Sequence, residues 1–284
     1  MLVVSWLLLP LVLSWLFISM FIGLSLSCVG LAPAKPFTPK DVSGIRLWLK
    51  ADAGVLDGSS NPITVDSTAI ATWQDQSGNN FHATQATAGN RPLWRSGPNG
   101  QNGLPGIAFD GTLKWLGRTE YIFTTAVSAF VVAKYANATG RYWAADIGGS
   151  GSNFVLGDPN TFGGTSQRMG FFAGDSNYSS ALVHTANAEL ISILATTPSG
   201  GDVVSNTTLR VNQTSGAITK LFNSGLWPDY SAPSGRGYAI GRAQGFTDVN
   251  MNGQVYEVIV YNRVLTTPER DAVEGYLVTK WNVV

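Results

Sequence analysis

The sequence predicts an all-β protein, a two-sheet antiparallel sandwich of the jelly-roll type with one short C-terminal helix. Short stretches rich in β-branched and aromatic residues recur along the chain, and turn signals containing Gly separate them. Gly is abundant, at 32 residues, and only 13% of residues are charged, well below the usual quarter. That composition is typical of many strands joined by tight turns. A single helical pattern is visible, and it closes the chain.

The predicted strands are short and follow one another at short intervals, which favours a sandwich over an α/β fold. They cover residues 45–50, 69–73, 106–109, 128–134, 153–156, 168–173, 189–196, 208–211, 217–222, 238–242 and 254–261.

The last of these stretches, 254–261, is apolar on both of its alternating faces. We therefore expect a strand inside a sheet and not at its edge. Thr266 and Glu269 have the spacing of a capping box, and Pro268 suits a first helical turn. These signals predict that a helix begins directly after the strand.

An apolar stripe marks the face of this helix that should cover the sheet. It contains Val273, Leu277 and Trp281. The charged positions expected to point to water are Arg270, Asp271, Glu274 and Lys280. Gly275 lowers helix stability by about 1 kcal/mol relative to Ala, and close packing on the sheet would explain its presence.

Residues 1–34 carry no charge, and residues 2–26 are almost wholly apolar, long enough to span a bilayer as a helix. Three interpretations stay open. The segment is a secretion signal cut after Ala34, an uncleaved membrane anchor through residues 2–26, or a lipid attachment site at Cys28. Each places the protein outside the cytoplasm, secreted or at a surface. Residues 35–44 then form a linker, and residues 45–284 the globular domain.

Four segments carry a resemblance to a known family. They are 47–55, 73–83, 103–111 and 253–281. In this order they resemble the laminin-G-like, concanavalin A-like jelly-roll domains, a fold that includes lectins and glucanases. The resemblance implies the sandwich fold and says little about function, because this fold hosts lectins, glucanases, adhesins and structural modules.

Several functions lack the residues they need. Eighteen basic and eighteen acidic residues cancel, and no basic run is present, so we expect no nucleic-acid partner. The single Cys28 leaves the globular part without a disulfide. His82 and His184 share no metal-ligand spacing and are expected to pack in loops or at the surface.

Glucanases share the resembled fold, which makes hydrolase chemistry a candidate. Retaining glycosidases need two carboxyl groups about 5 Å apart. Laminarinase-type relatives place them on one strand in a Glu-x-Asp-x-Glu pattern, which this sequence lacks. Glu257 stands alone among apolar residues, and Glu269 and Glu274 fall on the helix. We therefore expect no enzyme activity and no catalytic residue.

Asp75 and Asp110 are the candidates for a calcium site, because laminin-G-like domains often bind Ca²⁺ at a loop rim through carboxylates and backbone carbonyls. Lys114 follows the second turn and would repel a cation. The favoured interpretation is that both aspartates form Asx turns that hold their loops, and that no cofactor is bound.

Ligand contact is expected to rest on aromatic rings, since the C–H faces of sugars stack on Trp and Tyr. The candidates are Trp227, Tyr230, Trp94 and Tyr178, which lie among turn residues. The alternative for each is that the ring caps the core from a loop.

The first functional hypothesis is a non-catalytic recognition or adhesion module for a glycan or cell-surface polysaccharide. The alternative is a structural component of a phage or viral particle, such as a capsid decoration, spike or fibre, which contacts neighbouring virion proteins. The third is a glycoside hydrolase of the same fold.

Overall fold

The computed structural model describes residues 35–120, 122, 125–136, 143–148, 154–157, 168–173, 176–183, 185–197, 200–221, 237–243 and 250–283. Residues Phe37–Val284 form one compact unit. Within the described residues the unit consists of two antiparallel sheets, one α-helix and three short 3-10 helices, η1 (Pro39–Asp41), η2 (Ala88–Asn90) and η3 (Gly97–Asn99). The predicted fold class, a two-sheet antiparallel sandwich with a C-terminal helix, is confirmed.

The first sheet, called sheet A, lies next to the helix. Its described strands run in the order β15 (Thr214–Ser215), β14 (Thr207–Val211), β13 (Ala188–Thr196), β8 (Ala126–Tyr135), β18 (Asn252–Tyr261), β6 (Gly106–Asp110) and β5 (Leu93–Arg95). β1 (Ile45–Lys50) pairs with β18 at the side of this path.

The second sheet, sheet B, faces sheet A across the core. Its described strands run in the order β16 (Ile218–Lys220), β12 (Ser176–Val183), β11 (Arg168–Ala173), β10 (Phe154–Gly157), β9 (Trp143–Asp146), β17 (Tyr238–Ile240), β7 (Leu116–Arg118), β4 (Ala83–Thr84), β3 (Thr72–Trp73) and β2 (Val55–Leu56).

Strand β18 lies at the centre of sheet A, as its two apolar faces predict. It pairs with β8, β6 and β1, and every residue from Val255 to Tyr261 is buried. Leu47 of β1 lies opposite Val260, so the first long strand of the domain meets the last one. Because β1 and β18 pair in one sheet, removal of either strand would break backbone pairing in sheet A.

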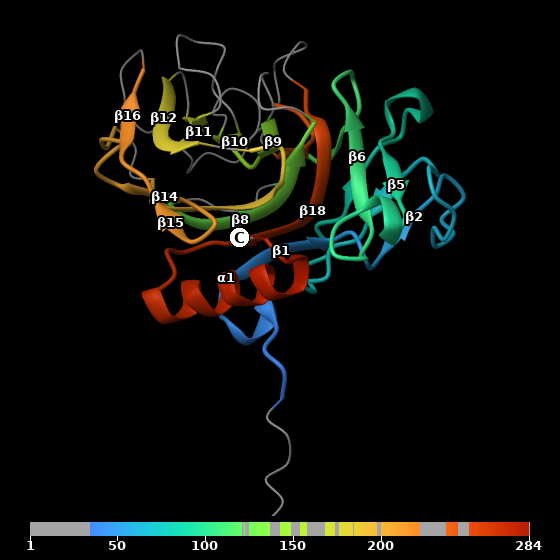
Figure 1. Ribbon diagram of the computed structural model, residues 1–284, viewed down its shortest axis with the longest axis horizontal. Helices are drawn as coiled ribbons and strands as arrows, with labels where there is room; N and C mark the ends of the chain where they lie inside the picture. Colours follow the sequence, from blue (N-terminus) through green and yellow to red (C-terminus); the bar gives the residue numbers. More distant parts are fainter. Residues whose placement is uncertain are drawn as a thin grey trace, which may run out of the picture. The chain divides into compact units, whose positions relative to one another are not determined.

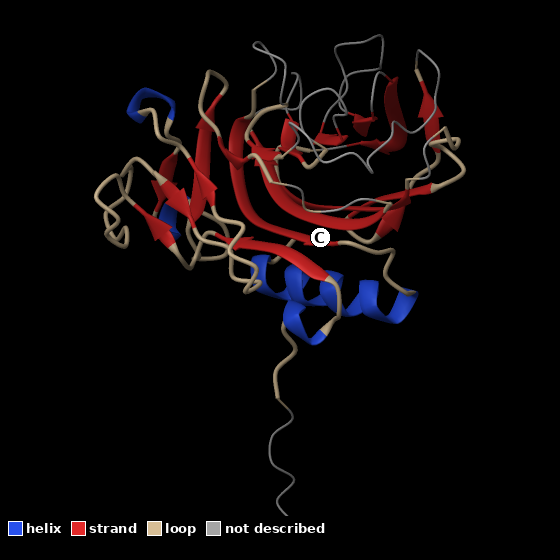
Figure 2. Cartoon of the chain, turned by 180° about the vertical axis from the view of Figure 1, so that it is seen from behind, coloured by secondary structure: helices blue, strands red, loops and turns tan. Residues whose placement is uncertain are grey.

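Helix α1 (Thr267–Trp281) covers the outer face of sheet A (Figure 1), and Figure 2 shows it along the same curved sheet from behind. The capping box predicted for Thr266 and Glu269 is present, with the Thr266 N–H donating to the Glu269 carboxylate at 2.9 Å. Hydrogen bonds from Arg263, and then from Thr266, lower the pKa of Glu269 to about 2. The stripe residues Val273, Leu277 and Trp281 are fully buried, which confirms the predicted covering face.

Two charged residues of this helix do not point to water as expected. Glu274 is buried and pairs with Arg210 of β14, with Arg210 Nε donating to Glu274 Oε1 at 3.0 Å. Lys280 keeps only 14% of its side chain exposed and reaches under the helix to two carboxylates. Helical periodicity predicts the side of the helix on which a residue lies. It does not predict that Arg210 and Glu257 of the sheet pair with Glu274 and Lys280.

Gly275 also differs from expectation, because close packing on the sheet does not explain it. A Cβ atom built at this position would have no neighbouring atom within 4 Å. The residue therefore lowers helix stability without a compensating contact.

We expect Gly275→Ala to raise the free energy of unfolding by up to about 1 kcal/mol, since Ala restricts the unfolded chain and suits a helix interior. Urea denaturation followed by tryptophan fluorescence measures the change. A decrease in stability would contradict the open space seen around Gly275.

Part of the predicted linker 35–44 belongs to the compact unit, which begins at Phe37. The Phe37 ring lies 6.2 Å from that of Tyr276, and the Tyr261 hydroxyl donates to the Pro39 carbonyl oxygen at 2.9 Å. The polar and Pro-rich composition of this segment predicts a linker. The composition does not reveal its aromatic partners, because Tyr261 and Tyr276 come from the far end of the chain.

The apolar segment 1–34, including the predicted helix, the cut after Ala34 and Cys28, lies outside the described residues. Within the part of the chain that is described, no helix has the length and apolar character needed to cross a bilayer.

Candidate functional site

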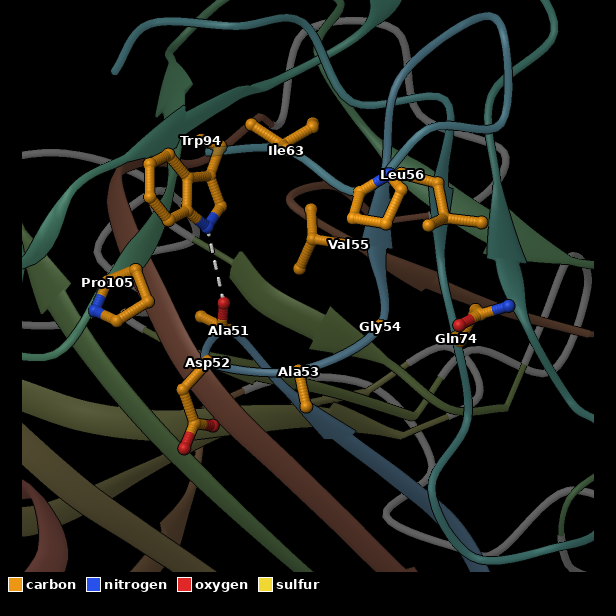
Figure 3. A pocket seen from close by; sticks show the side chains of 11 residues that line it. Ala51, Asp52, Ala53, Gly54, Val55, Leu56, Ile63, Gln74, Trp94 and Pro105 are labelled. Carbon is orange, nitrogen blue, oxygen red and sulfur yellow. Dashed lines mark hydrogen bonds between the residues drawn. The ribbon is translucent and has the colours of Figure 1, made fainter. Parts of the chain in front are cut away.

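A pocket of about 310 Å³ opens where the end of β1, the turn to β2 and strand β5 meet. In Figure 3 the indole of Trp94 and the ring of Pro105 stand on one side and Leu56 on the other, with Val55 and Ile63 between them. Asp52 and Gln74 add a carboxylate and an amide to the lining. We call this the Trp94 pocket. An aromatic wall with a few polar groups is the usual makeup of a small-molecule site.

The local sequence builds this pocket by turning the chain sharply after β1. Ala53 N–H donates to the Lys50 carbonyl at 3.1 Å, which closes a turn, and Gly54 follows with φ +69°. A side chain at Gly54 would meet Gln74 and Gln76, so glycine is required there by both conformation and space. The Trp94 indole N–H donates to the Ala51 carbonyl at 3.3 Å and so fixes the ring against the turn (Figure 3).

Asp52 connects the pocket to a buried charged cluster under helix α1. In Figure 3 its carboxylate is directed away from the Trp94 ring, and Asp52 Oδ1 accepts a hydrogen bond from Lys280 Nζ at 2.9 Å. The same Nζ donates to Glu257 Oε2 at 2.7 Å. One ammonium group therefore binds two carboxylates that come from opposite ends of the chain.

We call the buried group around this carboxylate the Glu257 cluster, and it comprises Glu257, Trp48, Tyr276, Lys280 and Trp281. Glu257 Oε1 accepts from Trp48 Nε1 at 2.6 Å and from the Tyr276 hydroxyl at 3.0 Å. Glu257 Oε2 accepts from Lys280 Nζ and from Trp281 Nε1, the latter at 2.8 Å.

These bonds decide the role of Glu257. Its side chain is fully buried, and each of its oxygens already accepts two hydrogen bonds. Burial, followed by the Glu257 carboxylate, raises the pKa of Tyr276, so this phenol stays protonated and donates. Glu257 therefore holds the helix on the sheet, and it is not placed to attack a substrate.

Two of the four aromatic candidates, Trp94 and Tyr178, lie among the described residues. Trp94 lies on strand β5 and not in a loop, and it lines the pocket. Tyr178 lies on β12, fully buried, with its ring stacked 4.7 Å from that of Phe171. It therefore offers no face to a sugar, and the prediction that Tyr178 contacts a ligand is wrong. Trp227 and Tyr230 lie outside the described residues.

The two calcium candidates act as Asx turns, the interpretation favoured from the sequence. Asp75 Oδ1 accepts from the backbone N–H of Ser77 and of Trp48, at 2.8 and 2.9 Å. Asp110 Oδ1 accepts from the backbone N–H of Thr112 at 3.0 Å. No group of three or more His, Cys, Asp or Glu side chains suited to a metal occurs among the described residues.

Comparison with known proteins finds no matching family model and no match among curated proteins. Solved structures do match in fold. Domain 4 of AbnA, a GH43 extracellular arabinanase from Geobacillus stearothermophilus solved with arabinotriose, has a TM-score of 0.51 at 11% identity, over 79% of this chain and 95% of that one. An arabinofuranosidase complexed with arabinofuranosyl-alpha-1,2-xylobiose has a TM-score of 0.57 at 15% identity, over 86% of this chain and 65% of that one.

Trypanosoma rangeli sialidase is similar as well, with a TM-score of 0.52 at 11% identity over 86% of this chain. The chain spans only about a third of the sialidase, with 34% covered. At these identities the likeness establishes the fold, a two-sheet β-sandwich that is found in carbohydrate-active enzymes.

These neighbours contradict the first functional hypothesis, a non-catalytic recognition module, and the expectation that the chain is not an enzyme. The expectation rested on a missing Glu-x-Asp-x-Glu pattern, which tests only for carboxylates that lie on one strand. Asp52 and Glu257 lie far apart in sequence and yet bind the same ammonium nitrogen. Spacing along one strand is thus one of several ways to bring carboxylates together.

Proposed function

We propose that this chain is a carbohydrate-active domain of the glycoside-hydrolase type that takes a neutral glycan into the Trp94 pocket. The observation that carries the proposal is the makeup of this pocket, with an indole as one wall and a carboxylate and an amide in its lining. A sugar ring can stack its C–H face on the indole while Gln74 and the backbone bind its hydroxyls.

The fold supports the choice of substrate class. Two of the similar structures contain arabinose-based oligosaccharides, arabinotriose and arabinofuranosyl-alpha-1,2-xylobiose. A short glycan built from pentoses is therefore the first ligand to test.

Asp52 is the carboxylate that this pocket offers for hydrolysis. It lies at the edge of the pocket, bound to Lys280, with 24% of its side chain exposed. The Asp52 carboxylate is directed away from the Trp94 ring, so a glycan stacked on Trp94 has to extend past this edge to bring its next linkage to Asp52. A carboxylate so placed can transfer a proton or stabilise positive charge on the sugar.

Binding is tested by isothermal titration of arabinotriose and arabinofuranosyl-xylobiose. We expect Trp94→Ala to weaken binding about tenfold or more, because loss of a buried aromatic contact is worth about 1.5–3 kcal/mol. Leu93→Ala, at an exposed neighbour on the same strand, is the matched control and should bind normally. Equal affinity of the wild type and Trp94→Ala would reject the pocket.

Hydrolysis is tested separately, by sugar release from arabinan and from the same oligosaccharides. We expect Asp52→Asn to lower the rate by about 10² or more while affinity stays within a few-fold. A wild-type protein that binds but releases no sugar would reject the hydrolase assignment. A fully active Asp52→Asn variant would reject only the role of Asp52.

We also propose that the sandwich is of the laminin-G-like, concanavalin A-like type. Support comes from where the resembling segments lie, since β1, β6 and β18 are neighbours in sheet A. An experimental structure with a different strand order would contradict this assignment.

A further inference from the structure

A second pocket, of about 470 Å³, lies where strands β4, β7 and β17 of sheet B meet. It shares no lining residue with the Trp94 pocket. Its polar and aromatic lining includes Thr87, Trp115, Arg118, Thr119 and Arg242. We call it the Trp115 pocket.

Arg242 is the side chain in this pocket whose contacts indicate a ligand. Its guanidinium carbon lies over the Trp115 ring, 3.6 Å from the ring centre, so the cation contacts the face of an indole. Its Nε–H is buried and has no hydrogen-bond acceptor among the residues that the structure describes. A buried donor without an acceptor destabilises the folded protein, and native structures rarely tolerate one without a reason.

Two arginines line this pocket, Arg118 and Arg242, and Arg242 is the better placed of the two to bind an anion. Arg118 is already engaged, since its Nε and Nη2 donate to the Glu120 carboxylate and its Nη1 donates to the Asn80 carbonyl. Asp146 is the acidic residue whose charge acts on Arg242, and its Oδ1 accepts from the Gly148 and Phe154 backbone N–H groups. Burial lowers the pKa of Arg242, and Asp146 partly opposes this.

Gly117 lines the pocket where β7 pairs with β17. A Cβ atom there would lie 2.3 Å from the Tyr238 carbonyl oxygen and 3.2 Å from the Trp115 ring. Glycine is therefore required where β7 passes β17, and the two strands approach closely at this side of the pocket.

We propose that the Trp115 pocket binds a sugar residue that carries a carboxylate, such as a uronic acid within a glycan. The planar carboxylate accepts hydrogen bonds from Arg242, whose fork geometry matches two oxygens. The sugar hydroxyls reach Thr87 and Thr119, whose side chains stand at the exposed rim. The pocket is larger than a lone carboxylate needs and lies in the size range of small-molecule sites.

Isothermal titration with three probes tests the ligand chemistry. The probes are oligogalacturonate, the same oligosaccharide fully methyl-esterified, and sodium acetate. We expect oligogalacturonate to bind at least tenfold more tightly than the ester, and its affinity to fall as salt is raised. Equal binding of acid and ester would overturn the role of the carboxylate. Acetate that binds as tightly as oligogalacturonate would overturn the sugar.

Variants test the residue. Arg242→Gln should weaken oligogalacturonate binding at least tenfold, whereas Arg270→Gln, which removes the same charge from the helix, should have no effect. If Arg242→Gln does not fold, Arg242→Lys keeps the cation, loses the fork and should bind several-fold more weakly. Undiminished binding by the folded Arg242 variant would overturn the proposal. Trp94→Ala should not change this binding, so failure at one pocket is separable from failure at the other.

Discussion

Replacing Glu257 with alanine is expected to destabilise the protein by about 3–5 kcal/mol, the cost of leaving one partner of a buried ion pair alone. The change would leave two indole N–H groups and a phenol without their acceptor at the junction of helix and sheet, and would leave the Lys280 ammonium group with Asp52 as its remaining carboxylate. Typical domains are stable by about 5–15 kcal/mol, so the loss approaches unfolding.

Urea denaturation followed by tryptophan fluorescence measures this change, since Trp48 and Trp281 both donate to Glu257. Lys280→Met should also cost several kcal/mol, because it leaves the fully buried Glu257 carboxylate without its cation, although three of its four donors remain. Asp271→Ala, at a half-exposed residue of the same helix, is the control and should stay within about 0.5 kcal/mol. Equal stability of Glu257→Ala and the wild type would show that the cluster is not needed for folding.

The Glu257 cluster also explains what could and could not be predicted from the sequence. The strand at 254–261 and the helix after it were predicted correctly, because apolar periodicity and a capping box are local signals. The role of Glu257 was missed, since its partner Trp48 lies 209 positions away. Periodicity and capping motifs relate residues that are a few positions apart, whereas the role of a buried carboxylate depends on residues that contact it in the folded protein.

The same limit applies to the candidate sites. Tyr178 looked like a loop residue because Ser and Asn surround it, but these polar neighbours belong to strand β12. Trp94 was chosen as a loop aromatic and lies on a strand at a pocket. No local sequence pattern predicts the contact between Arg242 and Trp115. The two residues flank β17 and β7, which lie far apart in the sequence and pair in sheet B.

A chain that ends at Leu265, before helix α1, is expected not to fold. Deletion of the helix would expose the face of sheet A that Val273, Leu277 and Trp281 cover, and all three are fully buried. Burial of each side chain is worth about 1.5–3 kcal/mol, so their sum is a large share of a typical 5–15 kcal/mol stability.

The deletion would also remove polar partners from the sheet. Glu257 would keep only Trp48 as a donor, and Arg210 would lose its buried partner Glu274. A graded test is Leu277→Ala, which should cost about 2–5 kcal/mol and still fold, with the lost stability measured by urea denaturation. For the truncated chain we expect no cooperative thermal transition by circular dichroism. If it melted as the full chain does, helix α1 would be an accessory, and sheet A would have to be stable with its outer face in water.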